Sequence, residues 1–344
     1  MESLIDPFTR GMLKNEASID DDSTLYLLVG GSGFLGINFS MAFSLMKKSW
    51  LNIDLTGGNS SKIWPNSFVN INDQRAVRNL KTDKRKKILV HLAAPSTHVT
   101  YLDRQNNFKS NESLGLNDDE VALFKKIETI LDLGVDSFIF ASTIDVYGKN
   151  LNSCDAINEE STCAPDTEYA KAKFALESMY MSAAKSRDVP IKILRLGHIY
   201  GPFEHLYYSR LLTTLSASIH DNENLRSDSK LIVELPVNFR RQYIYTFDIF
   251  RMTLMLLGLN SSITVNVVGK PIDAVELGVA YKTITGLDLQ INSKEFQDDY
   301  GALITSSYEN INNFPRVTFS EGLLHTSRSR FVSTGQKMVS RVKK

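Results

Sequence analysis

At 344 residues the chain is long enough for one large α/β domain or for two unequal ones. Hydrophobic residues make up 42% of it and charged residues 23%, and 39 basic side chains balance 39 acidic ones. Such a neutral chain has no overall field that would attract nucleic acid, and it has no apolar run of about 18 residues that would insert into a membrane. Its two cysteines, Cys154 and Cys163, lie in a predicted loop and indicate neither a disulfide framework nor a zinc site. We therefore expect a cytoplasmic protein with reduced thiols.

The two ends of the chain read as polar segments outside the fold. Residues 1–23 lack the positive start and the apolar core of a signal peptide, so we expect a lead-in. Residues 326–344 are expected to form a basic tail, because the last 23 residues hold six basic side chains and no acidic one. A contact with a membrane or an acidic partner is the alternative to a solvated tail.

A strand, a glycine-rich turn and a helix open the predicted fold. An apolar strand at 25–29 is followed by glycines with the spacing G-x-x-G-x-x-G and then by a helical pattern at 37–48. Glycines here let the backbone approach a pyrophosphate, whose charge is bound by the free N–H groups at the helix start. The order of the elements therefore predicts a dinucleotide site. The turn residues expected to contact the cofactor are Gly30, Gly33, Phe34, Leu35 and Gly36.

The next two predicted strands carry acidic side chains near their carboxyl ends. The strand at 50–55 holds Asp54, 18 residues after Gly36. A carboxylate there can accept hydrogen bonds from the adenosine ribose and would repel a 2'-phosphate, which favours NAD over NADP; a solvated turn aspartate is the alternative. The strand at 67–71 is followed by Asp73, which could reach the adenine.

A fourth predicted strand, at 88–92, leads into small residues that would let a ligand lie close to the backbone. Among them, Ala93 is expected beside the cofactor and Ser96 beside the substrate. One or two helices are predicted over 103–134, with a polar interruption at 117–120.

The fifth predicted strand, at 135–141, ends directly before Ser142 and Thr143. Ligands of an open parallel sheet lie outside the carboxyl ends of its strands, so the Thr143 hydroxyl is placed where it could contact a substrate. The segment from Lys171 to Ala184 is rich in Ala, Leu, Glu, Lys and Met, which predicts a helix that starts from the same edge.

Tyr169 and Lys173 are four residues apart on this helix and therefore share one helical face. An ammonium beside a phenol favours the phenolate, so the tyrosine can exchange a proton near neutral pH although its unperturbed pKa is about 10. The pair is a candidate general acid/base unit. A solvated helix with the same spacing by chance is the alternative, against which the rest of the chain must be weighed.

A sixth predicted strand, at 191–196, is followed by an irregular region. We interpret residues 24–200 as a dinucleotide-binding domain of the doubly wound Rossmann type, with α/β alternation and a parallel sheet. Residues 201–325 are interpreted mainly as a smaller α/β subdomain that contributes the substrate pocket. The elements predicted in it are strands at 230–235, 241–245 and 264–268 and helices at 247–258 and 272–285.

Eight segments together resemble the extended short-chain dehydrogenase/reductase family, in particular its NAD-dependent nucleotide-sugar epimerases and dehydratases. The resemblance runs from about residue 25 to residue 285. The segments are VGGSGFLG (29–36), IDLTGG (53–58), HLAAPS (91–96), SNESLG (110–115), FIFASTIDVYG (138–148), YAKAK (169–173), LRLGHIYGP (194–202) and RQYIYTFD (241–248).

The resemblance implies a role for each matching residue. Tyr169 would be the acid/base, and Lys173 would hold both its phenolate and the nicotinamide ribose. Thr143 would hydrogen-bond the sugar hydroxyl that is oxidised, and Arg241 would pair with the diphosphate of a nucleotide-sugar. Asn111 matches a family asparagine at the start of a helix.

The chain departs from the family pattern at four positions, of which Val29, where a threonine is usual, is a harmless change. His198 stands where an asparagine is usual and could change the contacts to the sugar or the diphosphate; a structural histidine is the alternative. The dehydratases of the family carry Asp-Glu after the threonine, because removal of water needs an acid and a base besides the tyrosine. Ile144 cannot donate a proton and Asp145 is one methylene shorter than glutamate, so we do not expect dehydratase activity. A sugar-acid decarboxylase is a less favoured alternative.

The sequence therefore predicts an NAD-dependent nucleoside-diphosphate-sugar 4-epimerase that works through a transient 4-keto sugar and needs no metal. A 4-ketoreductase or a C4-dehydrogenase would use the same residues. A nucleotide-binding protein without catalysis is disfavoured by the intact Thr143, Tyr169 and Lys173. The resemblance also implies a homodimer, built from the Tyr169 helix and the helix after Asn111. The apolar side chains compatible with such an interface, or equally with a core face, are Phe174, Leu176, Met179 and Met181.

Overall fold

The computed structural model describes most of the chain. The described residues are 23–57, 67–93, 110–111, 116–152, 156–208, 210–225, 231–295, 302–314 and 316–329.

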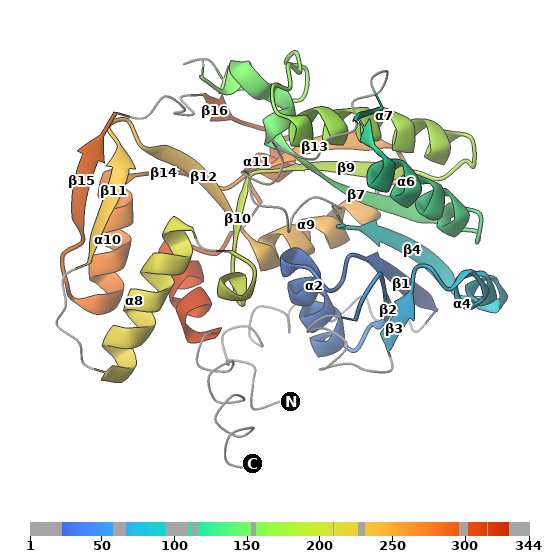
Figure 1. Ribbon diagram of the computed structural model, residues 1–344, viewed down its shortest axis with the longest axis horizontal. Helices are drawn as coiled ribbons and strands as arrows, with labels where there is room; N and C mark the ends of the chain where they lie inside the picture. Colours follow the sequence, from blue (N-terminus) through green and yellow to red (C-terminus); the bar gives the residue numbers. More distant parts are fainter. Residues whose placement is uncertain are drawn as a thin grey trace, which may run out of the picture.

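A seven-stranded parallel sheet forms the centre of the molecule, in the order β13-β9-β7-β4-β1-β2-β3 (Figure 1). The strand order reverses between β1 and β4, which is where such sheets bind ligands. This arrangement confirms the predicted doubly wound α/β class. The strands are β1 (Thr24–Val29), β2 (Ser49–Asp54), β3 (Phe68–Asn70), β4 (Lys86–His91), β7 (Ser137–Thr143), β9 (Ile191–Leu196) and β13 (Ile263–Val267).

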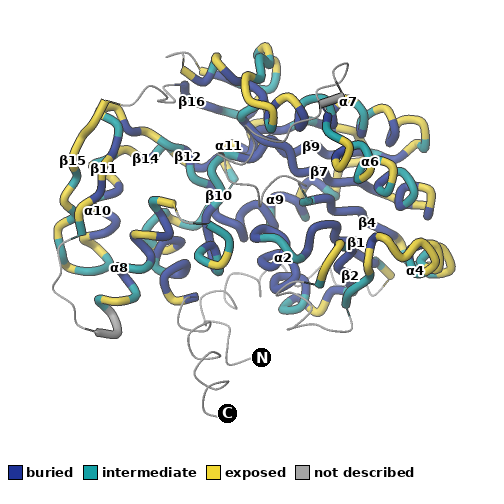
Figure 2. Tube along the Cα trace, in the orientation of Figure 1, coloured by how far each residue is buried: buried dark blue, intermediate teal, exposed yellow. Residues whose placement is uncertain are grey.

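Helices cover both faces of this sheet because successive strand residues point to opposite sides. On β1, Tyr26 and Leu28 pack with α2 (Phe34–Leu45) and α9 (Thr246–Leu257). The neighbouring residues of the same strand, Leu25, Leu27 and Val29, pack with the helices of the other face. Figure 2 shows the strands buried between the two layers. The helices of the second layer are α6 (Asp118–Leu131) and α7 (Glu168–Lys185).

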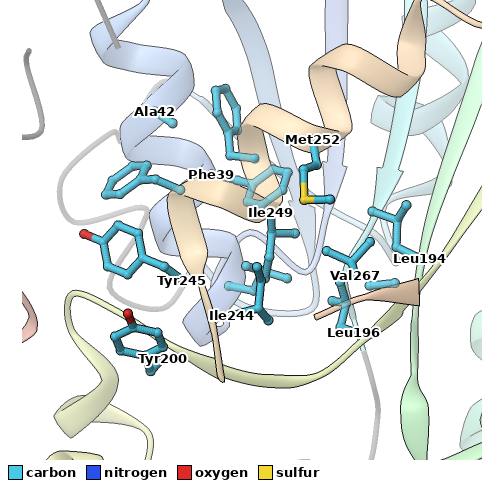
Figure 3. Close-up of a cluster of buried hydrophobic side chains, with 14 of the residues drawn as sticks. Phe39, Ala42, Leu194, Leu196, Tyr200, Ile244, Tyr245, Ile249, Met252 and Val267 are labelled. Atoms are coloured by element: carbon cyan, nitrogen blue, oxygen red, sulfur yellow. The ribbon is translucent and has the colours of Figure 1, made fainter. Parts of the chain in front are cut away.

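A smaller lobe joins the sheet at its carboxyl edge and shares one apolar core with it. Ile244 and Tyr245 lie in the same cluster as Phe39 of α2 and Ile249 of α9 (Figure 3). The elements of this lobe are the sheet β10 (His198–Tyr200), β12 (Arg240–Tyr245) and β14 (Pro271–Asp273), the pair β11 (Ile232–Pro236) and β15 (Gln290–Lys294), and the helices α8 (Leu211–Leu225) and α10 (Ala274–Thr285).

Shorter elements complete the described chain. They are β5 (Ser110–Asn111), β6 (Leu116–Asn117), β8 (Ala156–Ile157), β16 (Leu303–Ile304), α4 (Gln74–Asn79), α11 (Glu309–Asn312), the 3-10 segments η3 (Leu80–Thr82), η4 (Ile144–Asn152) and η5 (Glu204–Leu206), and helical residues 319–329.

Two predicted helices begin earlier than expected, because their N-cap residues lie earlier in the chain. The helix predicted at 37–48 begins at Phe34, directly after the N-cap Gly33. The helix predicted from Lys171 begins at Glu168, because the Thr167 hydroxyl accepts a hydrogen bond from the Ala170 N–H and caps it. As a result, Tyr169 lies inside the first turn of α7.

The polar interruption predicted at 117–120 is the start of α6. Asn117 accepts a hydrogen bond from the Glu120 N–H, and the Glu120 carboxylate accepts one from the Asn117 N–H, which is a capping box. Asn111 lies in β5 and not at a helix start, so that prediction is wrong. Residues 103–109 and 112–115 of the predicted helical stretch lie outside the described residues.

The strand predicted at 264–268 does not belong to the smaller lobe. It is β13, which pairs in parallel with β9 and forms an edge of the main sheet. The helix before it, α9, packs on α2 through Phe250, whose ring centroid is 5.2 Å from that of Phe39. The chain therefore leaves the main sheet after β9 and returns to it at β13. The domain boundary near residue 200 stays a prediction.

The side chains that were compatible with a dimer face or a core face are buried to different extents. Leu176 is a member of a core cluster, Met179 and Met181 are partly buried against the same cluster, and Phe174 is partly buried against a second one. The homodimer stays a prediction.

The predicted basic tail starts inside the last helix, where Thr326 is buried. In the described ranges, no helix combines the length and apolar character needed to cross a membrane.

Candidate active site

Two glycines of the turn between β1 and α2, Gly30 and Gly36, have no room for a side chain. Gly30 has a φ of +88°, and a Cβ atom there would lie 2.6 Å from the Ala93 nitrogen. A Cβ atom on Gly36 would lie 2.1 Å from the Gly30 carbonyl oxygen. Gly33 supplies no capping side chain, so the first N–H groups of α2 receive no side-chain cap. The turn thus presents bare backbone and a helix N-terminus, which suit a pyrophosphate.

Asp54 lies at the end of β2 and is directed at this turn. Its carboxylate accepts hydrogen bonds from the Ser32 N–H at 3.1 Å and from the Leu55 N–H at 2.7 Å. A carboxylate beside the glycine turn fits the ribose of a dinucleotide. Sequence reasoning missed Gly31, where a Cβ atom would lie 2.4 Å from the Asn52 side-chain oxygen.

Two further residues, Asp73 and Ser96, were expected beside the cofactor and the substrate. Asp73 caps α4, because its carboxylate accepts a hydrogen bond from the Ala76 N–H at 2.9 Å. Its contact with adenine stays a prediction. Ser96 lies outside the described residues.

Three candidate catalytic residues come from two neighbouring elements. Thr143 ends β7, which runs two residues further than predicted. Tyr169 and Lys173 lie one turn apart on α7, with the Lys173 Nζ 6.0 Å from the centroid of the Tyr169 ring. The same Nζ donates a hydrogen bond of 2.8 Å to the carbonyl oxygen of Ala141. β7 therefore fixes the ammonium that faces the phenol.

Lys173 is buried among groups of both charges. Burial lowers the pKa of its ammonium to about 8, and the nearby carboxylates of Glu120 and Glu177 oppose that shift. The ammonium also lies 4.9 Å from the centroid of the Phe140 ring. Its charge in turn helps burial to lower the pKa of His91. A lysine with such a pKa can change its charge in a range where enzymes work.

A buried polar network that sequence reasoning missed lies below this pair. Glu177, one turn after Lys173 on α7, accepts hydrogen bonds from Ser142 Oγ at 2.5 Å and from Arg195 Nη2 at 2.8 Å. Arg195 Nη1 donates to the Tyr147 hydroxyl at 3.0 Å. The only signal in the sequence was the four-residue step from Lys173 to Glu177. The network joins α7 to β7 and β9 through Ser142, the residue before Thr143.

The two residues after Thr143 differ in character. Ile144 is buried, with 3% of its surface exposed. Asp145 donates its backbone N–H to Thr143 Oγ1 at 3.2 Å. Burial raises the pKa of the Asp145 carboxyl; contact with Thr143 opposes this shift and the charge of Asp166 adds to it. Asp145 is thus a shielded carboxyl beside the threonine.

His198 and Arg241 come together at the lobe side of the site. They line one small cavity with Ile144, the residue next to Thr143. Burial lowers the pKa of His198 to about 4, and the charges of Arg241 and Arg210 add to this effect. His198 is therefore neutral at physiological pH and lies in the field of positive charges.

Within the described ranges, no group of three or more His, Cys, Asp or Glu side chains could hold a metal ion. Cys163 is a free, half-buried thiol whose pKa is raised by burial. Cys154 lies outside the described residues.

Comparison with known protein families identifies the family of this chain. The model of the NAD dependent epimerase/dehydratase family matches residues 26–268, which is most of the chain. The chain belongs to this family. The match includes the glycine turn, Thr143, Tyr169 and Lys173, so the predicted family is confirmed. The family depends on NAD, and the backbone cradle at Gly30 with Asp54 beside it fits that cofactor.

Curated relatives include both branches of the NAD dependent epimerase/dehydratase family. A dTDP-D-glucose 4,6-dehydratase of Dictyostelium discoideum is 28% identical over 225 residues, which is 62% of this chain and 48% of that protein. UDP-arabinose 4-epimerase 1 of Arabidopsis thaliana is 25% identical over 193 residues, which is 52% of this chain and 43% of that protein. The chain thus matches about half the length of these relatives.

Solved structures share the fold over a longer stretch. The UDP-glucose 4-epimerase of Thermotoga maritima has a TM-score of 0.68 at 21% identity, with 90% of this chain and 99% of that chain covered. The UDP-glucuronic acid 4-epimerase of Bacillus cereus, in complex with NAD, has a TM-score of 0.61 at 20% identity with the same coverage. These similarities establish the Rossmann-like fold of the family.

Proposed function

We propose that this chain is an NAD-dependent nucleoside-diphosphate-sugar 4-epimerase that works through a transient 4-keto sugar. The observation that carries the proposal is the geometry at the end of β7. A buried lysine is fixed there beside Tyr169, and the position after Thr143 is a buried isoleucine. Oxidation and reduction of a sugar hydroxyl need the first feature, whereas loss of water would need a proton donor at the second.

The roles of the three residues follow from their chemistry. Thr143 holds the sugar C4 hydroxyl by a hydrogen bond, while Tyr169 removes the hydroxyl proton as the carbonyl forms. The positive charge of Lys173 stabilises the phenolate that this transfer needs. When bound at the glycine turn and Asp54, NAD would supply the hydride acceptor and donor for both half-reactions. Tyr169 then gives the proton back to the oxygen after the 4-keto sugar has turned its other face.

The substrate class follows from the other end of the site. His198 and Arg241 offer a neutral hydrogen-bonding group and a planar cation beside the same cavity, which suit a diphosphate. The three 4-epimerases described above, from Arabidopsis thaliana, Thermotoga maritima and Bacillus cereus, are all named for UDP-sugars. We propose a nucleoside-diphosphate sugar as the substrate, with a homodimer in the cytoplasm as the working form.

A panel of UDP-, GDP-, CDP- and dTDP-sugars, given to the purified chain with NAD, tests this function. A 4-epimer should appear for at least one sugar without net reduction of the cofactor. Net change in the absorbance of the reduced cofactor would indicate a 4-ketoreductase or C4-dehydrogenase instead. Absence of any product from the whole panel would contradict the proposal.

A further inference from the structure

Part of the lining of the small cavity beside His198 and Arg241 is apolar. It includes Ile144, the residue after Thr143, together with Ala302 and Ile304. The side chains of these three residues belong to one buried cluster, and each residue is at most 8% exposed. We call Ile144, Ala302 and Ile304 the apolar wall. The cavity thus combines cationic residues with an apolar surface that starts directly after the catalytic threonine.

Hydrogen bonds fix the part of the apolar wall that comes from the end of the chain. The Gln242 side-chain amide donates to the carbonyl oxygen of Ile304 at 2.9 Å and accepts a bond from the Ile304 N–H at 2.8 Å. The Ala302 N–H donates to the carbonyl oxygen of Leu151 at 3.0 Å. In addition, β16 pairs with β8, where Ile304 lies opposite Ile157. A segment held at this many points cannot easily withdraw from a ligand, so the wall limits which groups fit.

The proposed catalytic roles bring one carbon of the sugar close to the apolar wall. Thr143 would hold the C4 hydroxyl, and the diphosphate on C1 would meet Arg241 in the same cavity as Ile144. Of the two neighbours of C4, C3 carries a hydroxyl that an apolar surface would leave without a partner. The group on C5 varies between sugars: it is hydrogen in a pentose, methyl in a 6-deoxyhexose, hydroxymethyl in a hexose and carboxylate in a uronic acid. The C5 substituent is therefore the group that suits the wall.

We propose, on the basis of the function given above, that the apolar wall selects a nucleoside-diphosphate sugar with hydrogen or methyl on C5. Ile304 is then a specificity-determining residue. The cavity has a volume of about 20 Å³, which is room for one group of about the size of water. A carboxylate against the wall would lose its hydration without a partner there, and a hydroxymethyl group would lose part of its own. A pentose or a 6-deoxyhexose is the substrate class that this chain should prefer.

Binding of three UDP-sugars to the full chain saturated with NAD tests the apolar wall, because these sugars differ on C5. UDP-xylose carries hydrogen there, UDP-glucose a hydroxymethyl group and UDP-glucuronic acid a carboxylate. The wild type should bind UDP-xylose about tenfold more tightly than UDP-glucose. It should bind UDP-xylose at least about 100-fold more tightly than UDP-glucuronic acid, since the buried carboxylate has no partner on the wall. Titration calorimetry measures the three dissociation constants.

Two matched variants separate selectivity from packing. Ile304→Ala should open the wall and reduce the preference for UDP-xylose over UDP-glucose to about threefold or less. Ile157→Ala is the control, because Ile157 is the strand partner of Ile304 and belongs to the same cluster, whereas of these two only Ile304 lines the cavity. Both variants lose the same atoms from the same cluster, but the control should keep the wild-type preference. Ile304→Val makes a smaller change in the same direction and replaces Ile304→Ala if that variant does not fold.

Several results would overturn the proposal. One is binding of UDP-glucuronic acid as tight as that of UDP-xylose, which would mean that a cation such as Arg240, in the lining of the same cavity, receives the carboxylate. Others are an unchanged preference in the Ile304 variants, an equal change in Ile157→Ala, or no detectable binding of any of the three sugars. Formation of an epimer is measured separately in the sugar panel. The expected order of affinities without any epimer would contradict the 4-epimerase assignment alone.

Discussion

The Lys173 ammonium is hydrogen-bonded to the carbonyl oxygen of Ala141, two residues before Thr143 on the same strand. The helix that carries Tyr169 and the strand that carries Thr143 are thereby connected through the lysine itself. A change at Lys173 removes a charge beside the phenol and a tie between these two elements. A substitution at Lys173 would therefore change both the charge beside Tyr169 and the contact between α7 and β7, whereas a substitution of the Tyr169 hydroxyl would change proton transfer alone.

Replacement of Tyr169 by phenylalanine should remove the acid/base and leave the ring in place. Turnover should fall by about 10²–10⁴-fold, because proton transfer by a positioned side chain contributes that much. NAD binding, followed by fluorescence titration, should be nearly unchanged. If the variant keeps its turnover, Tyr169 is not the acid/base.

The rate should depend on pH through Lys173. With a pKa of about 8, the ammonium is charged below that pH and loses its proton above it. A neutral amine cannot stabilise the phenolate, so kcat/KM should fall as the pH rises through about 8. Since this pKa lies below the ordinary value of about 10.4, the charge opposes folding, and stability should rise between these two pH values. A pH–rate profile without a limb near 8 would contradict this role.

Two glycines of the turn should respond differently to alanine. A Cβ atom on Gly36 would lie 2.1 Å from the Gly30 carbonyl oxygen, whereas one on Gly33 would have no neighbour closer than 3.5 Å. Gly36→Ala should lower the free energy of unfolding by more than about 2 kcal/mol, and Gly33→Ala by less than about 1 kcal/mol. Denaturant unfolding of the NAD-free protein compares them. Equal losses in both variants would mean that the turn relaxes around either side chain.

The Glu177–Arg195 pair should matter most when only one partner is removed. Arg195→Met leaves a buried, unpaired carboxylate and should cost about 3–5 kcal/mol of unfolding free energy. The double variant Glu177→Met/Arg195→Met should recover much of this loss. Arg187→Met, at an exposed pair with Asp132, should cost less than about 1 kcal/mol. A loss in the double variant as large as that of Arg195→Met would show that the charges themselves are not the reason.

Asp145 tests whether the site uses a second acid. Its carboxyl lies beside Thr143 and burial raises its pKa. In the proposed 4-epimerase the carboxyl has no proton to transfer, so Asp145→Asn should keep turnover within about tenfold. Because a raised native pKa means that the charged form opposes folding, this variant should be at least as stable at pH 7 as the wild type. Loss of turnover by a factor of 10² or more would indicate a second acid/base step.

Local patterns predicted the residues of the site better than the partners that hold them. The spacing of Gly30, Gly33 and Gly36 and the four-residue step from Tyr169 to Lys173 are visible within one element. Glu177 could not be assigned, because its function depends on β7 and β9 lying side by side, so that Ser142 and Arg195 meet it.

Pairing over long distances explains the remaining errors. An apolar strand such as residues 263–267 has the same pattern in either sheet, and only its pairing with β9 decides its place. Helix starts were misplaced for a simpler reason: Thr167 and Asn117 cap them through side chains that also occur in loops.

The return of the chain to the main sheet has a consequence for how the protein can be divided. A fragment that ends at residue 200 would lack β13 and would also lack α9, which covers Phe39 and Phe43 through Phe250. Those aromatic side chains would then face water, and the edge of β9 would be open to other chains. We therefore expect that residues 24–200 do not fold as an independent unit, although the motifs within this segment end well before β13.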